Sequence, residues 1–300
     1  MHSIFLRYFD EIARQGSIRK AAAVLNVSST SVNRKVIAVE NQLGVRLLAR
    51  SAEGVELTSA GRILLEHCRH TLTESRQVQL RLSDIRDLRT THVGIATIDS
   101  ASIEFLPHVI ETFKRDHPMT SFTINHCQPD EVVAAVARDE ADVGLSFVLD
   151  LHPDVRALSQ KAAAIGLILR HDHPFANRMS LSVHDIIDLP LVRTTDARGR
   201  SSLIDQIVSD SMIPKQASVF TNSLPLARRL ILSGRCVGLY TRLGFLNDLA
   251  AGELRFIPLE ATKLSDLPIG VIVSARKPLE PAAAVMCDLM IDYLKRLKLD

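Results

Sequence analysis

The sequence predicts an α/β protein with an all-α, winged helix-turn-helix domain at its N-terminus and a long helix between the two parts. Three observations predict this fold class. Residues 1–57 read as short helices with polar joints, residues 58–89 contain no proline, and strand-like and helical runs alternate after residue 90. Such alternation is typical of an α/β sheet that is largely parallel.

The composition is that of an ordinary globular protein, with 46% apolar and 23% charged residues among 300. No apolar run approaches the roughly 18 residues of a membrane span. Charges at Arg7, Asp10, Glu11 and Arg14 interrupt any apolar core of a secretory signal. We therefore expect a cytoplasmic protein with no membrane partner.

Charge is unevenly distributed along the chain, although the net charge is only +2. Residues 1–89 hold 14 Lys and Arg against 9 Asp and Glu, whereas residues 90–300 hold 22 against 25. A basic N-terminal part on a mildly acidic body suggests a polyanion partner for the N-terminal part alone.

Capping residues mark the helices of the N-terminal part. Ser17 can cap a short helix, and Ser28 can cap a longer one that Gly44 closes. Residues 45–57 are few and interrupted by glycine, which suits a small β-wing. Together these elements predict a helix-turn-helix followed by a wing.

The stretch 58–89 predicts a single helix roughly 45 Å long at 1.5 Å per residue. Its apolar positions form a partial coiled-coil seam. The seam residues are Leu65, Cys68, Leu72, Leu82, Ile85 and Leu88. Two interpretations stay open: the helix pairs with a second copy of the chain, or it lies on its own domain.

The body after residue 90 is long enough for two small lobes. The expected strands are His92–Thr97, Ser121–Asn125, Val143–Phe147, Ala163–Leu169, Leu191–Thr194, Ser218–Thr221, Val237–Tyr240, Phe256–Leu259 and Ile269–Ser274. The expected helices are Ser102–Arg115, Asp130–Arg138, Ser182–Asp188, Ser201–Met212, Ser223–Ser233 and Pro281–Leu297.

The second helix of the helix-turn-helix presents polar side chains on one face. In a DNA major groove, Arg suits guanine, Asn suits adenine and hydroxyl groups suit phosphates or bases. The predicted DNA contacts are Ser28, Ser29, Thr30, Ser31, Asn33, Arg34 and Lys35, with Arg50 reaching the backbone from the wing. The alternative is a polar helix face that only meets solvent.

Several ordered motifs resemble those of LysR-type transcriptional regulators. They are GSIRKAAAVLNVS at 16–28, SVNR at 31–34, VENQLGVRLLAR at 39–50 and VELTSAG at 55–61. The resemblance continues through ADVGL at 141–145, DLPLV at 188–192 and GELRFIPL at 252–259, so it covers essentially the whole chain. Ser29, Asn33 and Leu48-Ala49 depart from the family's frequent residues, so the operator sequence cannot be copied from a relative.

The resemblance implies a four-part layout and a set of partners. Residues 1–57 would be the DNA-binding domain, 58–89 the dimerising linker helix, 90–163 with 267–300 one sensor lobe, and 164–266 the other. The sensor would resemble periplasmic binding proteins, with a small-molecule effector between its lobes. The implied partners are double-stranded DNA, the effector, RNA polymerase and further copies of the chain in a homodimer or homotetramer.

The effector is expected where strands end and helices begin, because ligands of such folds lie at the carboxyl ends of strands. The residues at such places are Ser100, Ser102, Gln128, Phe147, Thr195, Arg198, Ser201, Ser202 and Thr221. The resemblance implies contacts at Thr97, Ser100, Ser102, Gln128, Phe147, Ser201 and Thr221. Arg198 is the natural counter-charge for an acidic effector, so a carboxylate is one hypothesis.

Two functions of other classes compete with the regulator. One is an enzyme fused to a DNA-binding head, and the other is an architectural DNA-binding protein whose body only oligomerises. The sequence contains no HExxH, GxSxG, P-loop or GxGxxG motif, and its four cysteines show no CxxC spacing. We therefore expect no catalytic residues, no metal site and no cofactor, although a redox role for one cysteine stays open.

Overall fold

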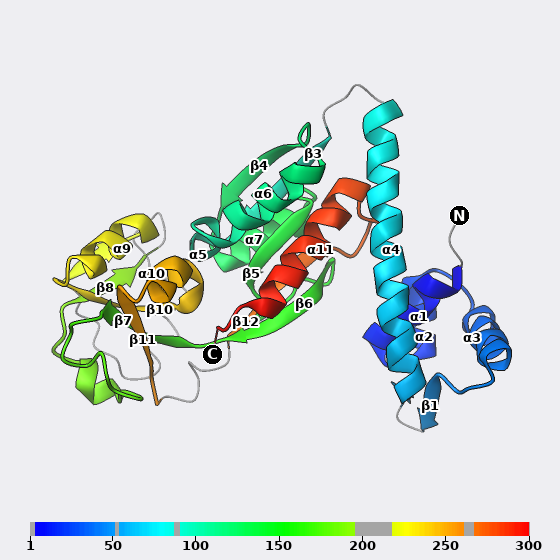
Figure 1. Ribbon diagram of the computed structural model, residues 1–300, viewed down its shortest axis with the longest axis horizontal. Coiled ribbons are helices and arrows are strands. Elements are labelled where there is room, and N and C mark those ends of the chain that lie inside the picture. Colours follow the sequence, from blue (N-terminus) through cyan, green and yellow to red (C-terminus); the bar gives the residue numbers. More distant parts are fainter. Residues whose placement is uncertain (1–3, 52–53, 87–90, 196–217, 261–266, 300) are drawn as a thin grey trace. The chain divides into compact units, whose positions relative to one another are not determined.

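The chain forms two compact units, Met1–Arg86 and Asp87–Asp300, in a computed structural model (Figure 1). The structure describes residues 4–51, 54–86, 91–195, 218–260 and 267–299. None of the helices within these ranges combines the length and the apolar character needed to span a bilayer.

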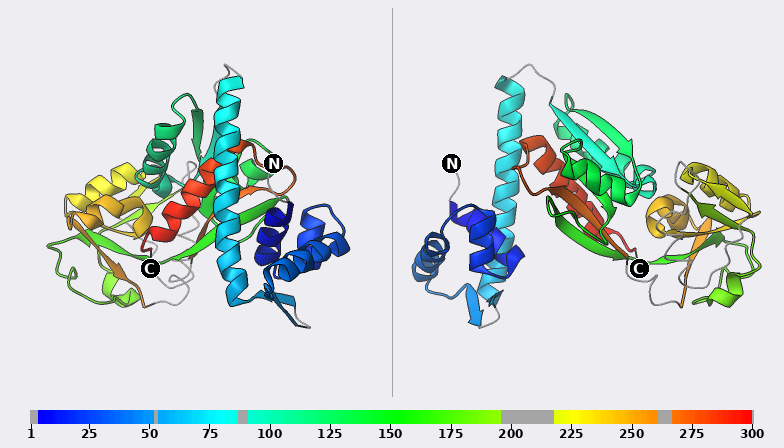
Figure 2. Two further views of the ribbon diagram at one scale, coloured as in Figure 1. Left: turned by 45° about the vertical axis from the view of Figure 1, so that its right-hand side comes forward. Right: turned by 180° about the vertical axis from the view of Figure 1, so that it is seen from behind.

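The N-terminal unit has the expected winged helix-turn-helix. Its elements are α1 (Ile4–Gln15), α2 (Ile18–Val24), α3 (Ser29–Leu43), β1 (Leu48–Ser51), β2 (Gly54–Leu57) and α4 (Ser59–Arg86). Figure 2 shows α1 packed against α4, and α2 packs on α1 and α3. Strands β1 and β2 pair antiparallel, so the predicted wing is confirmed as a hairpin.

Local capping chemistry fixes the boundaries of α2 and α3. The Ser17 hydroxyl accepts the Lys20 N–H at 3.4 Å, and the Ser28 hydroxyl accepts the Ser31 N–H at 3.2 Å. Gly44 ends α3 with φ at +68°, a left-handed conformation that favours glycine.

The core of the N-terminal unit explains part of the expected seam on α4. Phe9, Val32 and Val36 are completely buried there, and Leu65 and Cys68 of α4 pack into the same cluster. The first turns of α4 therefore belong to the fold of their own domain. Beyond Leu72 the seam side chains lie outside the described part of the chain.

The C-terminal unit contains two five-stranded sheets, which define two lobes. The first lobe has the strand order β4-β3-β5-β12-β6. Its strands are β3 (His92–Thr97), β4 (Ser121–His126), β5 (Val143–Phe147), β6 (Val155–Ala163) and β12 (Leu267–Ser274). Its helices are α5 (Asp99–Ser102), α6 (Phe105–Asp116), α7 (Pro129–Ala137) and α11 (Pro281–Arg296), with α6 and α11 packed together.

The second lobe has the strand order β11-β7-β10-β8-β9. Its strands are β7 (Ile165–Arg170), β8 (Leu191–Thr194), β9 (Val219–Thr221), β10 (Val237–Thr241) and β11 (Leu254–Pro258). The helices are α9 (Leu224–Leu232) and α10 (Leu246–Ala250), with short 3₁₀ turns η1 (Val183–Ile186) and η2 (Arg242–Phe245).

The expectation of largely parallel sheets is confirmed, because four of the five strands in each sheet run in the same direction, and one strand in each sheet runs against them. In the first sheet β12 runs antiparallel to both β5 and β6, and in the second sheet β7 runs antiparallel to both β10 and β11. The physical reason is that the chain crosses from the first lobe to the second and returns, so these strands enter their sheets from the opposite end.

The expected strand Ala163–Leu169 is corrected, because the chain changes sheets within it. Strand β6 ends at Ala163 in the first sheet, and β7 begins at Ile165 in the second. The expected helix Ser102–Arg115 is divided into α5 and α6, and α10 was not expected. The expected helix Ser201–Met212 lies outside the described residues.

Candidate DNA interface and candidate effector pocket

Helix α3 places the predicted reading residues on its solvent side. Val32 and Val36 are completely buried, so the helix is fixed to the core along one stripe. On the other side the side chains of Ser28, Ser29, Thr30, Ser31, Arg34 and Lys35 are exposed. This is the arrangement that a helix needs if it is to enter a major groove.

Asn33 differs from its neighbours on α3, because it is only half-exposed. Its Oδ1 atom is buried and has no hydrogen-bond partner among the described residues. A buried unpaired oxygen is costly, at about 1–3 kcal/mol. Asn33 is therefore the predicted contact that is least available to DNA in this conformation.

The wing is attached to the turn between α1 and α2. The Val55 N–H donates to the Gly16 carbonyl at 3.0 Å, and a Cβ added at Gly54 would lie 2.6 Å from the same oxygen. Arg50 lies on β1 opposite Val55 in the hairpin register, while its side chain is outside the described part.

Glu40 ties the reading helix to the wing, a role that the sequence analysis missed. Its carboxylate is 3% exposed and accepts the N–H groups of Leu47 at 2.8 Å and Leu48 at 3.2 Å. Arg46 donates to the other oxygen at 3.3 Å. The sequence pattern indicated that this carboxylate is buried, because Glu40 follows the buried Val36 by one helical turn and so falls on the apolar side of α3.

Leu47 is also held from the side of α4. Its carbonyl accepts the Thr58 N–H at 3.0 Å and the Thr58 hydroxyl at 3.2 Å. A Cβ added at Gly61, in the first turn of α4, would lie 2.1 Å from that carbonyl oxygen. The peptide groups around Leu47 thus connect α3, the wing and α4.

A cavity of about 80 Å³ lies in the C-terminal unit, lined by both lobes. Its lining residues are Ile98, Asp99, Ser100, Cys127, Gln128, Pro129 and Phe147 from the first lobe, and Thr194, Leu224 and Tyr240 from the second. Each of them lies at or just beyond a strand end, or at the start of a helix. Three of the predicted contacts, Ser100, Gln128 and Phe147, are among them.

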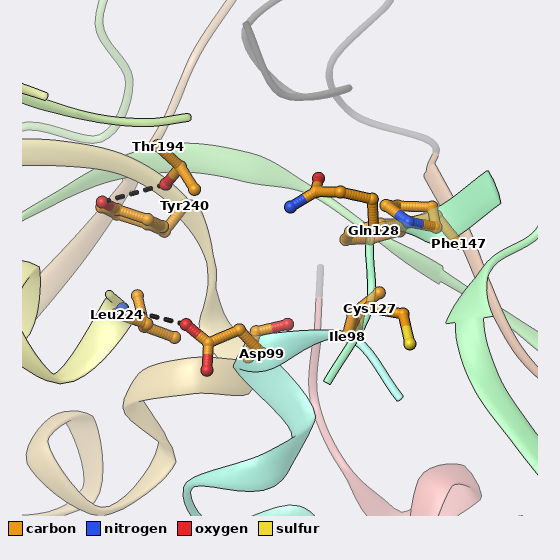
Figure 3. A pocket seen from close by; sticks show the side chains of 10 residues that line it. Ile98, Asp99, Cys127, Gln128, Phe147, Thr194, Leu224 and Tyr240 are labelled. Carbon is orange, nitrogen blue, oxygen red and sulfur yellow. Dashed lines mark hydrogen bonds between the residues drawn. The ribbon is translucent and has the colours of Figure 1, made fainter. Parts of the chain in front are cut away.

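Figure 3 shows the Gln128 amide directed into this cavity, with Phe147 beside it. On the opposite wall the Thr194 hydroxyl donates to the Tyr240 hydroxyl at 3.2 Å. Burial raises the pKa of Tyr240 to about 12, and the nearby Asp99 charge adds to the increase. The phenol is therefore neutral at physiological pH.

The other predicted contacts do not line the cavity or are not described. Thr97 is completely buried, and its hydroxyl donates to the carbonyls of Ile98 and Leu145. The Ser102 hydroxyl donates to the Asp99 carbonyl at 2.7 Å, and the Thr221 hydroxyl accepts the Ser223 N–H at 3.0 Å. Thr195 is half-buried without lining the cavity. Arg198, Ser201 and Ser202 lie outside the described residues.

Two carboxylates of the first lobe accept backbone N–H groups of the second. Asp99 Oδ2 accepts the Leu224 N–H at 2.9 Å, drawn as a dashed line in Figure 3. Glu104 Oε2 accepts the Asn247 N–H at 2.6 Å. Both acceptors sit around α5, so this short segment carries contacts between the lobes. The sequence analysis singled out neither carboxylate.

Glu104 is almost fully buried, and burial raises the pKa of its carboxyl group. Asp248, one residue after Asn247, raises that pKa further, whereas the backbone N–H of Asn247 and the Arg228 charge lower it. Arg228 itself forms two hydrogen bonds to Asp248, at 2.5 and 2.6 Å.

The described residues contain no group of three or more His, Cys, Asp or Glu side chains placed to hold a metal ion. All four cysteines are free; Cys68, Cys236 and Cys287 are buried, and Cys127 is half-buried beside the cavity. Burial raises the pKa of the Cys127 thiol, which lowers its reactivity.

Comparison with protein-family models finds one match in each of the two units. Residues 5–62 match the family described as bacterial regulatory helix-turn-helix protein, lysR family, and residues 86–295 match the LysR substrate binding domain.

Two relatives illustrate the similarity. The chain is 28% identical over 203 residues to the uncharacterized HTH-type transcriptional regulator YvbU of Bacillus subtilis (strain 168), which covers 67% of this chain and 68% of that protein. It is 26% identical over 265 residues to the Hca operon transcriptional activator HcaR of Escherichia coli (strain K12), covering 85% and 86%.

One solved structure, full-length CbnR complexed with its target DNA, superposes with a TM-score of 0.52 at 22% identity. The superposition covers 98% of this chain and 100% of CbnR. At this identity the likeness shows the fold alone.

Proposed function

This chain belongs to the LysR family of bacterial transcription regulators, and we propose that it reads operator DNA through α3 and the wing. The observation that carries this proposal is the exposed polar side of α3, fixed from behind by the buried Val32 and Val36. Arg34 reads a base edge, and the hydroxyl groups of Ser28 and Thr30 meet phosphates. Double-stranded DNA is the proposed partner. CbnR, which shares the fold, has been solved in complex with its own target DNA.

The remaining predicted contacts divide by position. Ser29, Ser31 and Lys35 flank Arg34 on the same exposed side of α3. Arg50 is assigned to the DNA backbone from the wing. To read a base, Asn33 must turn its Oδ1 outward, since that atom is buried and has no hydrogen-bond partner among the described residues.

The effector occupies the cavity between Gln128 and Tyr240. What supports this is the meeting of strand ends and helix starts from two lobes around one hollow, the place where ligands of open α/β folds bind. An effector that contacts both walls stabilises one arrangement of the lobes and shifts the population toward it. Ser100, Gln128 and Phe147 are contacts on the first lobe, with Thr194 and Tyr240 on the second.

The second lobe holds further candidates for effector contacts, which do not line the described cavity. They are Thr195, Arg198, Ser201, Ser202 and Thr221. Thr221 ends β9, and Thr195 directly follows Thr194 of the cavity wall. The other three residues come later in the sequence after β8. A carboxylate effector depends on Arg198 as its counter-charge. Thr97 and Ser102 support the site from behind through the backbone bonds of their hydroxyls.

The domain division follows the same proposal. Residues 1–57 form the DNA-binding domain and 58–89 the linker helix; one sensor lobe consists of 90–163 and 267–300, the other of 164–266. The strand membership of the two sheets supports these lobes. We assign no catalytic step and no cofactor to either lobe. We place the protein in the cytoplasm, with RNA polymerase as a partner, and we propose that copies of the chain form a homodimer or homotetramer.

The test is repeated selection of duplexes from a random-sequence pool by the full-length protein, at a stated salt concentration because electrostatic binding falls steeply with salt. Enrichment of an inverted repeat is the expected result. Salt-sensitive binding without enrichment would favour an architectural protein, and no binding at all would leave an enzymatic body as the remaining alternative.

A further inference from the structure

The described wall of the effector cavity carries negative charge. Asp99 is the one Asp, Glu, Lys, Arg or His residue among the described lining residues. Most of the others are apolar or neutral hydrogen-bonding groups, and Tyr240 stays neutral because burial raises its pKa to about 12.

The backbone donors of α9 that would hold an anion are already used. The Leu224 N–H donates to Asp99, and the Leu226 N–H donates to the Ser223 hydroxyl at 3.4 Å. Pro225, between them, has no N–H. A carboxylate ligand would have to displace Asp99 from this helix end.

Helix α7, which begins at the same cavity, is equally unsuited to an anion. Pro129, its first residue, has no N–H to donate. Asp130 and Glu131 bring two carboxylates into the first turn, and Glu131 accepts the Gln128 N–H at 3.0 Å. Their charges oppose a second anion near this helix end.

Two arginines of the second lobe are held by other groups. Arg228 is bound to Asp248, and the Arg242 guanidinium lies 4.2 Å from the centre of the Phe256 ring. In the described part of the cavity wall, no cation faces Asp99.

Resting on the proposed effector function of this cavity, we propose that the effector is a small organic amine, whose ammonium group meets Asp99 and whose apolar body lies against Phe147. Asp99 uses Oδ2 for Leu224, and Oδ1 has no hydrogen-bond partner among the described residues. The aromatic residues Phe147 and Tyr240 also line the cavity, and the face of such a ring attracts a cation. Ile98, Pro129 and Leu224 supply the apolar surface.

An amine also gives Asp99 a role in switching. Its carboxylate already joins the lobes through Leu224, so an ammonium bound to the free oxygen adds a contact at the junction. A cavity of about 80 Å³ limits the molecule to a compact one in this arrangement of the lobes.

The test measures the affinity of the full-length protein for matched probes by calorimetry. Benzylamine, benzyl alcohol and benzoate share one body, and butylamine, butanol and butyrate share another. We expect an amine to bind about tenfold or more tightly than its alcohol and carboxylate partners, equivalent to about 1.4 kcal/mol. Failure of both amines to bind would overturn the assignment.

Matched variants test whether the charge of Asp99 causes the tighter binding of amines. Asp99→Asn keeps an oxygen for the Leu224 N–H but removes the charge, and it should weaken amine binding about tenfold. Asp116→Asn removes the same charge from an exposed position at the end of α6, outside the described cavity wall, and should leave amine binding unchanged. Equal amine affinity in the wild type and Asp99→Asn would overturn the proposal.

Two further results distinguish a failure of the amine assignment from a failure of the proposed effector site. If carboxylates bind and Arg198→Ala abolishes their binding, the amine assignment fails while the cavity remains the effector site. Ser100→Trp fills the cavity, so probes that bind this variant unchanged would occupy another place, and the proposed effector site itself would fail.

Discussion

The buried carboxylate of Glu40 accepts the backbone N–H of Leu47 at 2.8 Å, joining the reading helix to the segment that enters the wing. Thr58 holds the carbonyl of the same residue from the start of α4. The reading helix, the wing and the linker helix are therefore connected through one residue. A rotation of α4 that reaches Leu47 would also reach the residues proposed to contact DNA.

Replacing Glu40 by Leu should destabilise the N-terminal unit and detach the wing. Two buried N–H groups would lose their acceptor, at a cost of about 1–3 kcal/mol each. Hydrogen exchange at the amides of Leu47 and Leu48 should accelerate, which mass spectrometry of the full-length protein measures. Glu40→Gln keeps one acceptor oxygen and should show a smaller change.

Glu56→Leu, an exposed glutamate of the wing, is the control for the added apolar side chain. If Glu40→Leu exchanges these amides no faster than Glu56→Leu, the carboxylate does not hold the wing.

Replacing Gly61 by Ala should also disturb this connection, by overpacking. The added Cβ would lie 2.1 Å from the Leu47 carbonyl oxygen, so the backbone of one segment must move. Comparable overpacking costs about 1–3 kcal/mol. Thermal unfolding should show a lower melting temperature for Gly61→Ala, whereas Ser59→Ala, an exposed neighbour, should leave it unchanged. Equal melting temperatures would mean that α4 does not approach Leu47 this closely.

Glu104 should make stability depend on pH. Burial raises its pKa in the folded protein, so the folded state binds its proton more tightly than the unfolded state does. By linkage, stability falls as pH rises from the unfolded pKa through the raised folded pKa, and is constant above it. Asp248 and Arg228 face the same carboxyl group and act on its pKa in opposite directions.

Glu104→Gln keeps an oxygen for the Asn247 N–H but has no proton to lose. Urea unfolding across this pH range should therefore show the wild type losing stability relative to the variant as pH rises. Parallel curves for the two proteins would contradict a raised pKa at Glu104.

Local chemistry made the N-terminal unit predictable from the sequence. Ser17, Ser28 and Gly44 act on backbone groups within a few residues, so their caps can be read without knowing the rest of the fold. Strand β6 was missed because its burial varies along its length and Lys161 and Gln160 interrupt its apolar residues. Its place in the sheet depends on β12, about a hundred residues later.

The lining of the cavity, too, could be predicted only where it depends on local sequence. Ser100 and Gln128 were identified because they follow strands, a feature visible in the sequence. Tyr240 and Leu224 reach the cavity only when the second lobe meets the first, which depends on packing between distant segments. Asp99 stands next to Ser100 in sequence, but its bond to Leu224 could not be inferred from that position.

The central claim, that α3 reads base sequence, is tested most directly by measuring the affinity of the wild type and Arg34→Ala for the selected duplex and a scrambled one. Arg7→Ala removes the same charge from an exposed position on α1 and serves as the control. We predict that Arg34→Ala loses about 1–3 kcal/mol on the selected duplex and much less on the scrambled one. Equal losses on both duplexes would show that Arg34 contacts only phosphates and would contradict the claim.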